Sequence, residues 1–214
     1  LATIRSLRPL DESVRRGNPG LEGATPIPQF STLRFGVLGF GRIGQATARK
    51  ADGLGFQVAV CDILNPPPGP TPEGWSVLGF DELLQRSDVL SIHTPLDETT
   101  EHLIDSDALS KLPEGAFLIN TARGGVVDTD ALMEALGSGH LQAAGLDVFE
   151  DEPLPSGHPL TSFERCILTP HAAFYSEQSY LELKRRSIEN VTELLLGREP
   201  RNILNPEVLT KGRQ

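Results

Sequence analysis

The chain has 214 residues, of which 38% are hydrophobic and 22% are charged, a composition typical of a globular protein with one sizeable core. Its formal net charge of -10 argues against nucleic acid and anionic membranes as partners. No stretch reaches the roughly 18 unbroken apolar residues of a membrane span, and no signal peptide is visible. We therefore expect a cytoplasmic protein.

The cysteines and the first residues limit the fold further. Cys61 and Cys166 lie far apart inside apolar runs, which favours core positions in a reducing compartment over a disulfide or a metal site. The chain begins with Leu1 rather than Met and runs at once into a helix-like mixture of basic and apolar residues. We expect the chain to be an excised piece of a longer protein. We also expect it to bind no metal.

From residue 34 onward, short apolar runs alternate with helix-like segments, which predicts βαβ units and an α/β fold. Most runs are apolar almost throughout, as in parallel strands covered on both faces. The expected strands span residues 34–40, 57–62, 88–94, 116–122, 143–149 and 166–171. The expected helices span 42–53, 80–86, 129–137 and 177–196, and proline-rich loops are expected at 65–72 and 152–159.

A glycine-rich turn follows the first expected strand and opens the first helix, with the sequence Gly39, Phe40, Gly41, Arg42, Ile43, Gly44. In a GxGxxG motif the first glycine permits the tight turn, the second lets the backbone approach a pyrophosphate, and the third allows close helix packing. A turn without any nucleotide fits the same pattern. The motif alone therefore predicts a dinucleotide site only weakly.

Asp62 strengthens the nucleotide interpretation because it ends the second expected strand. A carboxylate at that place accepts hydrogen bonds from adenosine ribose hydroxyls and repels a 2′-phosphate. No arginine or lysine follows at 63–65, so NAD is favoured over NADP. The alternative is that Asp62 only starts a turn before the proline-rich loop.

Arg123 follows the strand expected at 116–122 and precedes Gly124 and Gly125. Open parallel sheets bind ligands beyond the carboxyl ends of their strands. A guanidinium there either decorates the surface or holds a carboxylate through two parallel hydrogen bonds. If a dinucleotide lies across the strand ends, the substrate should carry a carboxylate.

Oxidation of a carbinol needs a group that exchanges the hydroxyl proton near neutral pH, and histidine does this best. His171 ends the strand expected at 166–171 and is the best candidate. His93 is expected to line a cofactor pocket or to pack, and the others are expected at the surface: His102, His140 and His158. The pattern does not choose a partner carboxylate for His171 among Asp147, Glu150, Asp151 and Glu152.

Five motifs resemble, in order and spacing, the D-isomer-specific 2-hydroxyacid dehydrogenases: GFGRIGQ, DVLSIHTPLDETTEHLI, FLINTARGGVVD, AGLDVFEDEP and LTPHAAF. The resemblance covers residues 34–200. It implies a Rossmann-type, doubly wound, mostly parallel sheet that binds NAD. It also implies an oxidoreductase that interconverts a D-2-hydroxy acid and its 2-oxo acid by hydride transfer.

The resemblance also implies roles for single residues. Arg123 would bind the substrate carboxylate and polarise the carbonyl, His171 would be the acid/base, and Glu152 would be its partner. Asp147 would contact the nicotinamide carboxamide, and Phe174 would lie next to the substrate. Further residues would line the cofactor: Thr94, Pro95, Leu96, Thr100, Thr121, Ala122 and Ala173.

Residues 170–191 look like the C-terminal binding protein branch of this family, whose members bind NADH and in animals act as transcriptional corepressors. That branch usually has tryptophan at the position of Phe174. The likeness to this branch, from which Phe174 departs, implies an NADH-sensing scaffold with little or no turnover as the alternative function.

The family builds its substrate domain largely from upstream residues, so that domain is expected to be largely missing here. We expect an interdomain helix at 1–17, an NAD-binding domain at 18–175, and a returning helix and tail at 176–214. Family members commonly pair through the coenzyme domain, so a homodimer is expected. On its own, the 214-residue piece is expected to bind NAD without turnover.

Overall fold

The computed structural model describes residues 1–18, 20–21, 24–62, 69–201, 203 and 205. These form two compact units, Leu1–His171 and Ala172–Gln214. Part of the proline-rich loop expected at 65–72, the residues 63–65 and the end of the tail lie outside the described residues. Within the described part, no helix is both long and apolar enough to cross a membrane.

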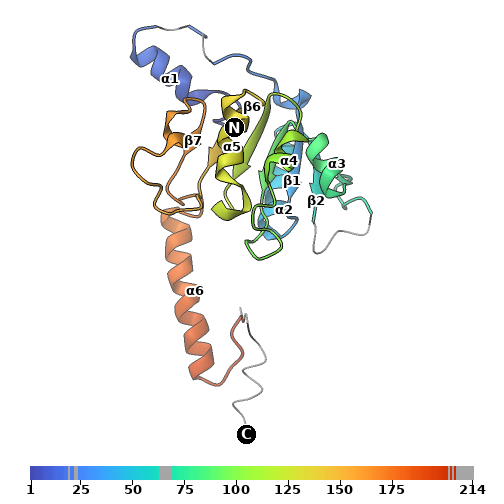
Figure 1. Cartoon of the computed structure of the whole chain (residues 1–214). Coiled ribbons are helices and arrows are strands. Elements are labelled where there is room, and N and C mark those ends of the chain that lie inside the picture. The colour runs from blue at the N-terminus through green and yellow to red at the C-terminus, as the bar shows by residue number, and fades with distance from the viewer. Residues whose placement is uncertain (19, 22–23, 63–68, 202, 204, 206–214) are drawn as a thin grey trace. The chain divides into compact units, whose positions relative to one another are not determined.

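The first unit contains a seven-stranded sheet in the order β3-β2-β1-β4-β5-β6-β7 (Figure 1). Every strand pair in it is parallel. The strands are β1 (Arg34–Leu38), β2 (Gln57–Cys61), β3 (Ser76–Val77), β4 (Val89–Ile92), β5 (Ala116–Asn120), β6 (Leu141–Leu146) and β7 (Ile167–Leu168). The predicted α/β, doubly wound fold is confirmed, although the pattern missed the two-residue β3.

The α-helices are α1 (Leu7–Arg15), α2 (Arg42–Gly53), α3 (Phe80–Gln85), α4 (Ser106–Ser110), α5 (Thr129–Gly137) and α6 (Glu177–Leu195). The bounds of α2 and α5 agree with the prediction, while the short α4 was not predicted. The helix expected at 1–17 is shorter and begins only at Leu7, because Ser6 before it has a φ of 49°, a left-handed conformation that cannot continue a right-handed helix.

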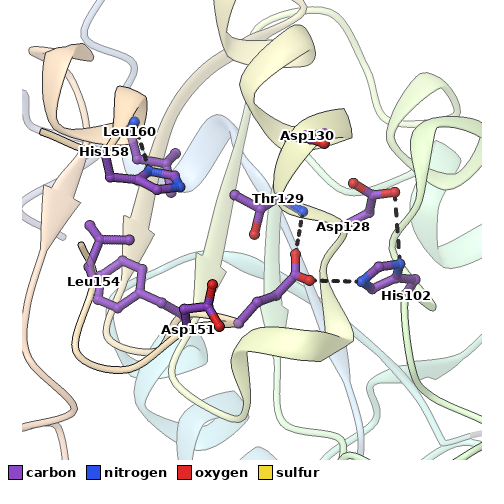
Figure 2. Close-up of a pocket in the computed structure, with 10 residues that line it drawn as sticks. His102, Asp128, Thr129, Asp130, Asp151, Leu154, His158 and Leu160 are labelled. Atoms are coloured by element: carbon purple, nitrogen blue, oxygen red, sulfur yellow. Dashed lines mark hydrogen bonds and ion pairs between the residues drawn. The ribbon is translucent and has the colours of Figure 1, made fainter. Parts of the chain in front are cut away.

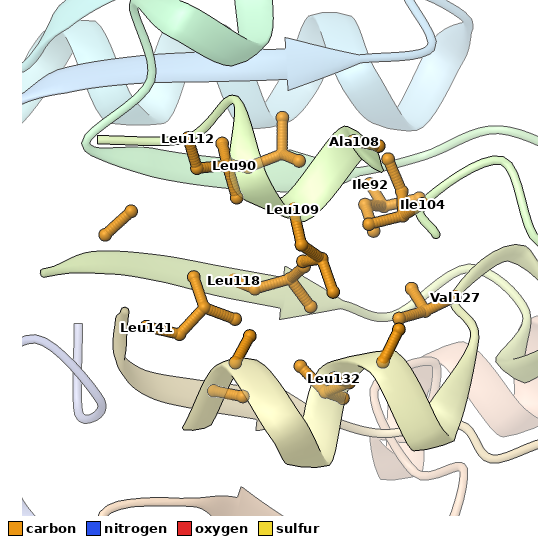
Figure 3. Close-up of a cluster of buried hydrophobic side chains, with 14 of the residues drawn as sticks. Leu90, Ile92, Ile104, Ala108, Leu109, Leu112, Leu118, Val127, Leu132 and Leu141 are labelled. Atoms are coloured by element: carbon orange, nitrogen blue, oxygen red, sulfur yellow. The ribbon is translucent and has the colours of Figure 1, made fainter. Parts of the chain in front are cut away.

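Consecutive strand residues point to opposite faces of the sheet, and each face has its own core. Leu118 of β5 packs with Leu109 of α4 and Leu132 of α5 on one face (Figure 3). Its neighbour Phe117 belongs to the second cluster, with Ala48 of α2. This two-sided burial explains why the strands read as continuous apolar runs.

The amino-terminal segment is tied to the last strand of the sheet. Arg8 in α1 donates from its Nη1 to the carbonyl oxygens of Phe163 and Cys166, at 3.2 and 3.0 Å. These residues precede β7. The contact therefore helps to fix the strand that leads to His171.

The second unit contains α6, which begins with a capping box formed by Ser176 and Ser179. The helical period predicted here is confirmed, but its apolar residues are exposed rather than buried. These include Leu181, Ile188, Val191 and Leu195.

Candidate active site

The predicted functional residues of the first unit follow the ends of strands of one parallel sheet. The order β2-β1-β4-β5-β6-β7 brings the carboxyl ends of these strands to the same edge in succession. Asp62 follows β2, Arg123 follows β5, and His171 follows β7.

The glycine turn between β1 and α2 has the geometry that a bound pyrophosphate requires. Gly39 has a φ of 93°, and a Cβ there would lie 2.7 Å from the carbonyl carbon of His93. A Cβ on Gly44 would lie 2.0 Å from the Gly39 carbonyl oxygen, whereas one on Gly41 would meet no atom within 4 Å. Gly41 is the N-cap of α2 and makes no side-chain cap. The open helix end therefore fits an anion.

The different surroundings of Gly44 and Gly41 predict different effects of substitution by alanine. Gly44→Ala should destabilise the fold by about 1–3 kcal/mol, because its Cβ collides with backbone. Gly41→Ala should leave the melting temperature unchanged and weaken NADH binding roughly tenfold, or about 1.4 kcal/mol. Thermal unfolding and NADH titration of both variants check this. Equal NADH affinity in Gly41→Ala and the unmodified chain would contradict the assignment.

Asp62 contacts the glycine turn directly. Its Oδ2 accepts a hydrogen bond from the Phe40 backbone N–H at 2.8 Å. The carboxylate therefore stabilises the turn, a role that the sequence did not suggest. The predicted contact with a ribose stays a prediction.

The segment after β4 contains polar groups at different depths. His93 lies 2.9 Å from the Ser91 hydroxyl through its Nε2, and burial lowers the pKa of His93 to about 4, so its ring is neutral at pH 7. Thr94 is 6% exposed, and its hydroxyl has no hydrogen-bond partner among the described residues. Leaving such a hydroxyl unpaired costs about 1–3 kcal/mol, so it fits a site that receives a polar ligand. Thr100 donates to the Pro95 carbonyl oxygen at 2.7 Å and folds this segment back on itself.

The turn that carries Arg123 is held by a residue that sequence reasoning missed. Asn120 is buried, and its side chain donates to the Arg123 carbonyl oxygen at 2.8 Å and accepts from the Ala122 N–H at 3.0 Å. The exposed Arg123 side chain donates from Nη1 to the Ala122 carbonyl oxygen at 2.6 Å. Thr121 is also exposed. An asparagine that ends a buried strand was the available signal.

Gly124 joins the Arg123 turn to the loop after β6. A Cβ on Gly124 would lie 1.9 Å from the carbonyl carbon of Phe149 and 2.4 Å from the Glu150 nitrogen. The two loops therefore pack backbone against backbone.

Glu152 and His171 form a hydrogen-bonded pair. The distance from Glu152 Oε2 to His171 Nδ1 is 2.8 Å, and Glu152 Oε1 accepts from the Phe149 N–H at 3.1 Å. The hydrogen bond from His171 is the main cause that lowers the pKa of Glu152. The geometry thus selects Glu152 from the four carboxylates that the sequence left open.

Backbone contacts position His171 from the neighbouring strand. Its φ is 52°, and its N–H donates to the Asp147 carbonyl oxygen at 2.7 Å. Asp147 is buried, and its Oδ1 accepts from the Thr169 hydroxyl at 2.5 Å. The end of β6 therefore orients the end of β7.

A cavity of about 560 Å³ lies beside the pair. Glu152 and His171 line it together with apolar residues that include Phe149, Pro153, Leu154 and Leu168. Arg123 does not line it, and its guanidinium bonds to the Ala122 carbonyl oxygen instead. Ala173 and Phe174 belong to the second compact unit. Their predicted contacts with cofactor and substrate stay predictions.

The remaining histidines have their own partners. His140 Nε2 lies 2.9 Å from the Leu109 carbonyl oxygen, and His158 Nδ1 accepts from the Leu160 N–H at 3.2 Å. The exposed His102 pairs with Glu150, which the sequence did not predict.

Comparison with known proteins agrees with this arrangement. A glyoxylate reductase of Thermofilum pendens is 38% identical over 98% of this chain and 63% of its own length. The crystal structure of the TT0316 protein from Thermus thermophilus has a TM-score of 0.85 and 37% identity over 95% of this chain and 64% of its own. A D-lactate dehydrogenase from Aquifex aeolicus, complexed with NAD and lactic acid, has a TM-score of 0.81 and 30% identity over 92% and 63%.

The chain thus spans less than two thirds of the length of these relatives. Residues 1–173 match the NAD binding domain of the D-isomer specific 2-hydroxyacid dehydrogenases. By this match, and by the parallel sheet with its glycine turn and histidine–glutamate pair, the chain belongs to the D-isomer specific 2-hydroxyacid dehydrogenase family.

Proposed function

We propose that the protein to which this chain belongs is an NAD-dependent oxidoreductase that interconverts a D-2-hydroxy acid and its 2-oxo acid. The observation that carries the proposal is the 2.8 Å hydrogen bond between Glu152 and His171. This pair lies at the edge of the sheet formed by the carboxyl ends of the strands, where the glycine turn also lies. A histidine oriented by a carboxylate is the usual device for exchanging a hydroxyl proton.

The glycine turn, Asp62 and the segment that begins at Thr94 are the groups that would hold NAD. The fit rests on the open helix end at Gly41 and on the unpaired, buried Thr94 hydroxyl. When bound, NAD supplies the acceptor or donor of the hydride. Because Asp62 is acidic, we propose NAD rather than NADP as the preferred cofactor.

The chain's own residues supply the proton chemistry and the binding of substrate. Nδ1 of His171 is engaged by Glu152, so Nε2 is the nitrogen that would exchange the proton of the substrate oxygen. Glu152 fixes the ring and stabilises the imidazolium that forms when the alcohol is oxidised. Arg123 is exposed and offers a guanidinium to the substrate carboxylate.

The test uses a protein that contains this chain and has the full length of its relatives. Its oxidation of NADH is measured with a panel of 2-oxo acids such as glyoxylate, hydroxypyruvate and pyruvate. Turnover should need the carboxylate, so a methyl ketone of similar size should react far more slowly. Replacing Arg123 by Lys should raise KM for the acid by about 10- to 100-fold, because the bidentate contact is lost while the charge stays.

Two results would count against this proposal. One is equal turnover of acid and ketone, which would remove the carboxylate from recognition. The other is an unchanged KM in Arg123→Lys. A matched control is Arg165→Lys, because Arg165 binds the Thr25 carbonyl oxygen and not the strand-end edge.

The scaffold alternative needs the glycine turn but no oriented histidine. An NADH-binding protein without turnover on any 2-oxo acid would support it. The likeness to the C-terminal binding protein branch, the homodimer and the cytoplasmic location stay predictions. Exposed Leu7 and Val14 on α1 are compatible with a protein contact at that helix.

A further inference from the structure

A second histidine–carboxylate pair lies near the first. His102 Nε2 is 3.0 Å from Glu150 Oε2, and Glu150 Oε1 accepts from the Thr129 N–H at 2.8 Å. In Figure 2, dashed lines that start at the labelled Thr129 and His102 mark these two contacts. One side chain thus joins three segments: the β4–α4 connection, the start of α5 and the loop after β6.

His102 is held in an unusual backbone conformation by its surroundings. Its φ is 47°, which costs a residue other than glycine about 1–3 kcal/mol. Its N–H donates to the Gly125 carbonyl oxygen at 2.8 Å. His102 therefore contacts the Arg123 turn through its backbone and the loop after β6 through its ring.

The backbone of Phe149 and Glu150 is where these contacts meet the Glu152–His171 pair. The Phe149 N–H binds Glu152 Oε1 at 3.1 Å, and Gly124 packs on the next peptide, between Phe149 and Glu150. A shift of the Phe149 backbone would therefore move the carboxylate of Glu152 and the turn that carries Arg123 together.

We propose that Glu150 and His102 are positioning residues whose hydrogen-bonded contact fixes the backbone of Phe149 and Glu150 and so keeps Glu152 aimed at His171. The idea rests on the proposed function for its effect on turnover. Its effect on the geometry of Glu152 does not depend on that function.

The contact shifts the pKa values of both side chains toward their charged forms. The hydrogen bond to Glu150 is the main cause that raises the pKa of His102. Burial raises the pKa of Glu150, but the bonds from Thr129 and His102 outweigh it, so the pKa is lowered. The folded pKa of His102 lies above its ordinary value of 6.5. Its contribution to the stability of the fold is therefore complete below about pH 6.5 and is lost as pH rises through the raised pKa.

Other charged groups face the same ring. Asp128 Oδ2 is 3.9 Å from His102 Nδ1, and Glu101 adds a weaker attraction. The adjoining cavity of about 270 Å³ is also lined by Asp130, Asp151 and His158. Asp128 and Glu101 both raise the pKa of His102, so neither reverses the direction of its shift.

The experiment compares Glu150→Ala and Glu150→Gln with the unmodified chain. The first readout is the carboxyl pKa of Glu152 from carbon NMR, which needs no turnover. In Glu150→Ala this pKa should rise toward its ordinary value, because Glu152 no longer holds its bond to His171. In the full-length protein kcat should fall about 10- to 100-fold, with KM nearly unchanged.

Glu150→Gln keeps both hydrogen bonds without the charge, so the pKa of Glu152 should stay low. Asp151→Asn is the matched control, because Asp151 is the next carboxylate of the loop and has no hydrogen bond or ion pair in the described structure. It should change neither readout.

His102→Asn tests the pair from the other side if Glu150→Ala does not fold. Asparagine tolerates the left-handed backbone but is too short to reach Glu150. It should raise the pKa of Glu152 and remove any decline of kcat that follows the titration of His102. If the pKa of Glu152 is unchanged in Glu150→Ala, or in His102→Asn where Glu150→Ala does not fold, the proposal is overturned, whether or not the protein turns over 2-oxo acids.

Discussion

Replacing His171 by asparagine in the full-length protein should lower kcat by roughly 10²- to 10⁴-fold while leaving the affinity for NADH unchanged. Asparagine is the suitable replacement because His171 has a φ of 52°, a left-handed conformation that asparagine tolerates well. The variant keeps a polar side chain of similar reach toward Glu152 but cannot exchange a proton near neutral pH. Steady-state kinetics and NADH titration measure the two effects separately.

The matched control is His158→Asn. His158 Nδ1 accepts from the Leu160 N–H, and the asparagine oxygen can replace that acceptor. This variant should keep its kcat. Normal turnover in His171→Asn, or an equal loss in both variants, would remove His171 from the proton transfer.

Replacing Gly124 by alanine should destabilise the fold by about 3 kcal/mol, since its Cβ would overlap the backbone of Phe149 and Glu150. For a chain of this size that corresponds to a fall in melting temperature of about 10 °C. Backbone cannot move aside as a flexible side chain can. Because Phe149 also holds Glu152, the pKa of Glu152 should rise in any molecules that remain folded.

Gly125→Ala is the neighbouring control. A Cβ there would lie 3.1 Å from Leu96 Cδ2, the far end of an exposed side chain that can move. It should lower the melting temperature by only a few degrees. Equal melting temperatures for the two variants would show that the backbone contact at Gly124 relaxes easily.

Local hydrophobic periodicity was enough to predict the sheet and the helices α2 and α5 that pack on it. The runs at 116–122 and 143–149 read as strands because both faces of each are covered. The short β3 and α4 were missed, since two and five residues are too few to show a period. The helix expected at 1–17 starts late because a single left-handed residue, Ser6, is not visible in a hydrophobic pattern.

In the candidate site, the glycine turn was predictable from the spacing of its residues alone. Each glycine in this motif has a separate role, in the tight turn, in the approach of a ligand or in helix packing. The partner of His171 could not be chosen from the residues alone, since four carboxylates lie within six positions and only the folded loop decides which one faces the ring. Asn120 and Glu150 act through contacts with backbone, for which composition and spacing give little warning.

The bond from Asp62 to the Phe40 N–H has a consequence for redesign of coenzyme preference. Exchanging this aspartate for glycine or alanine, to admit a phosphorylated ribose, would also remove a hydrogen bond that holds the glycine turn. Asparagine would neutralise the charge and still accept from that N–H. Engineering toward NADPH should therefore begin with asparagine and add a basic side chain elsewhere, so that selectivity and loop integrity are changed one at a time.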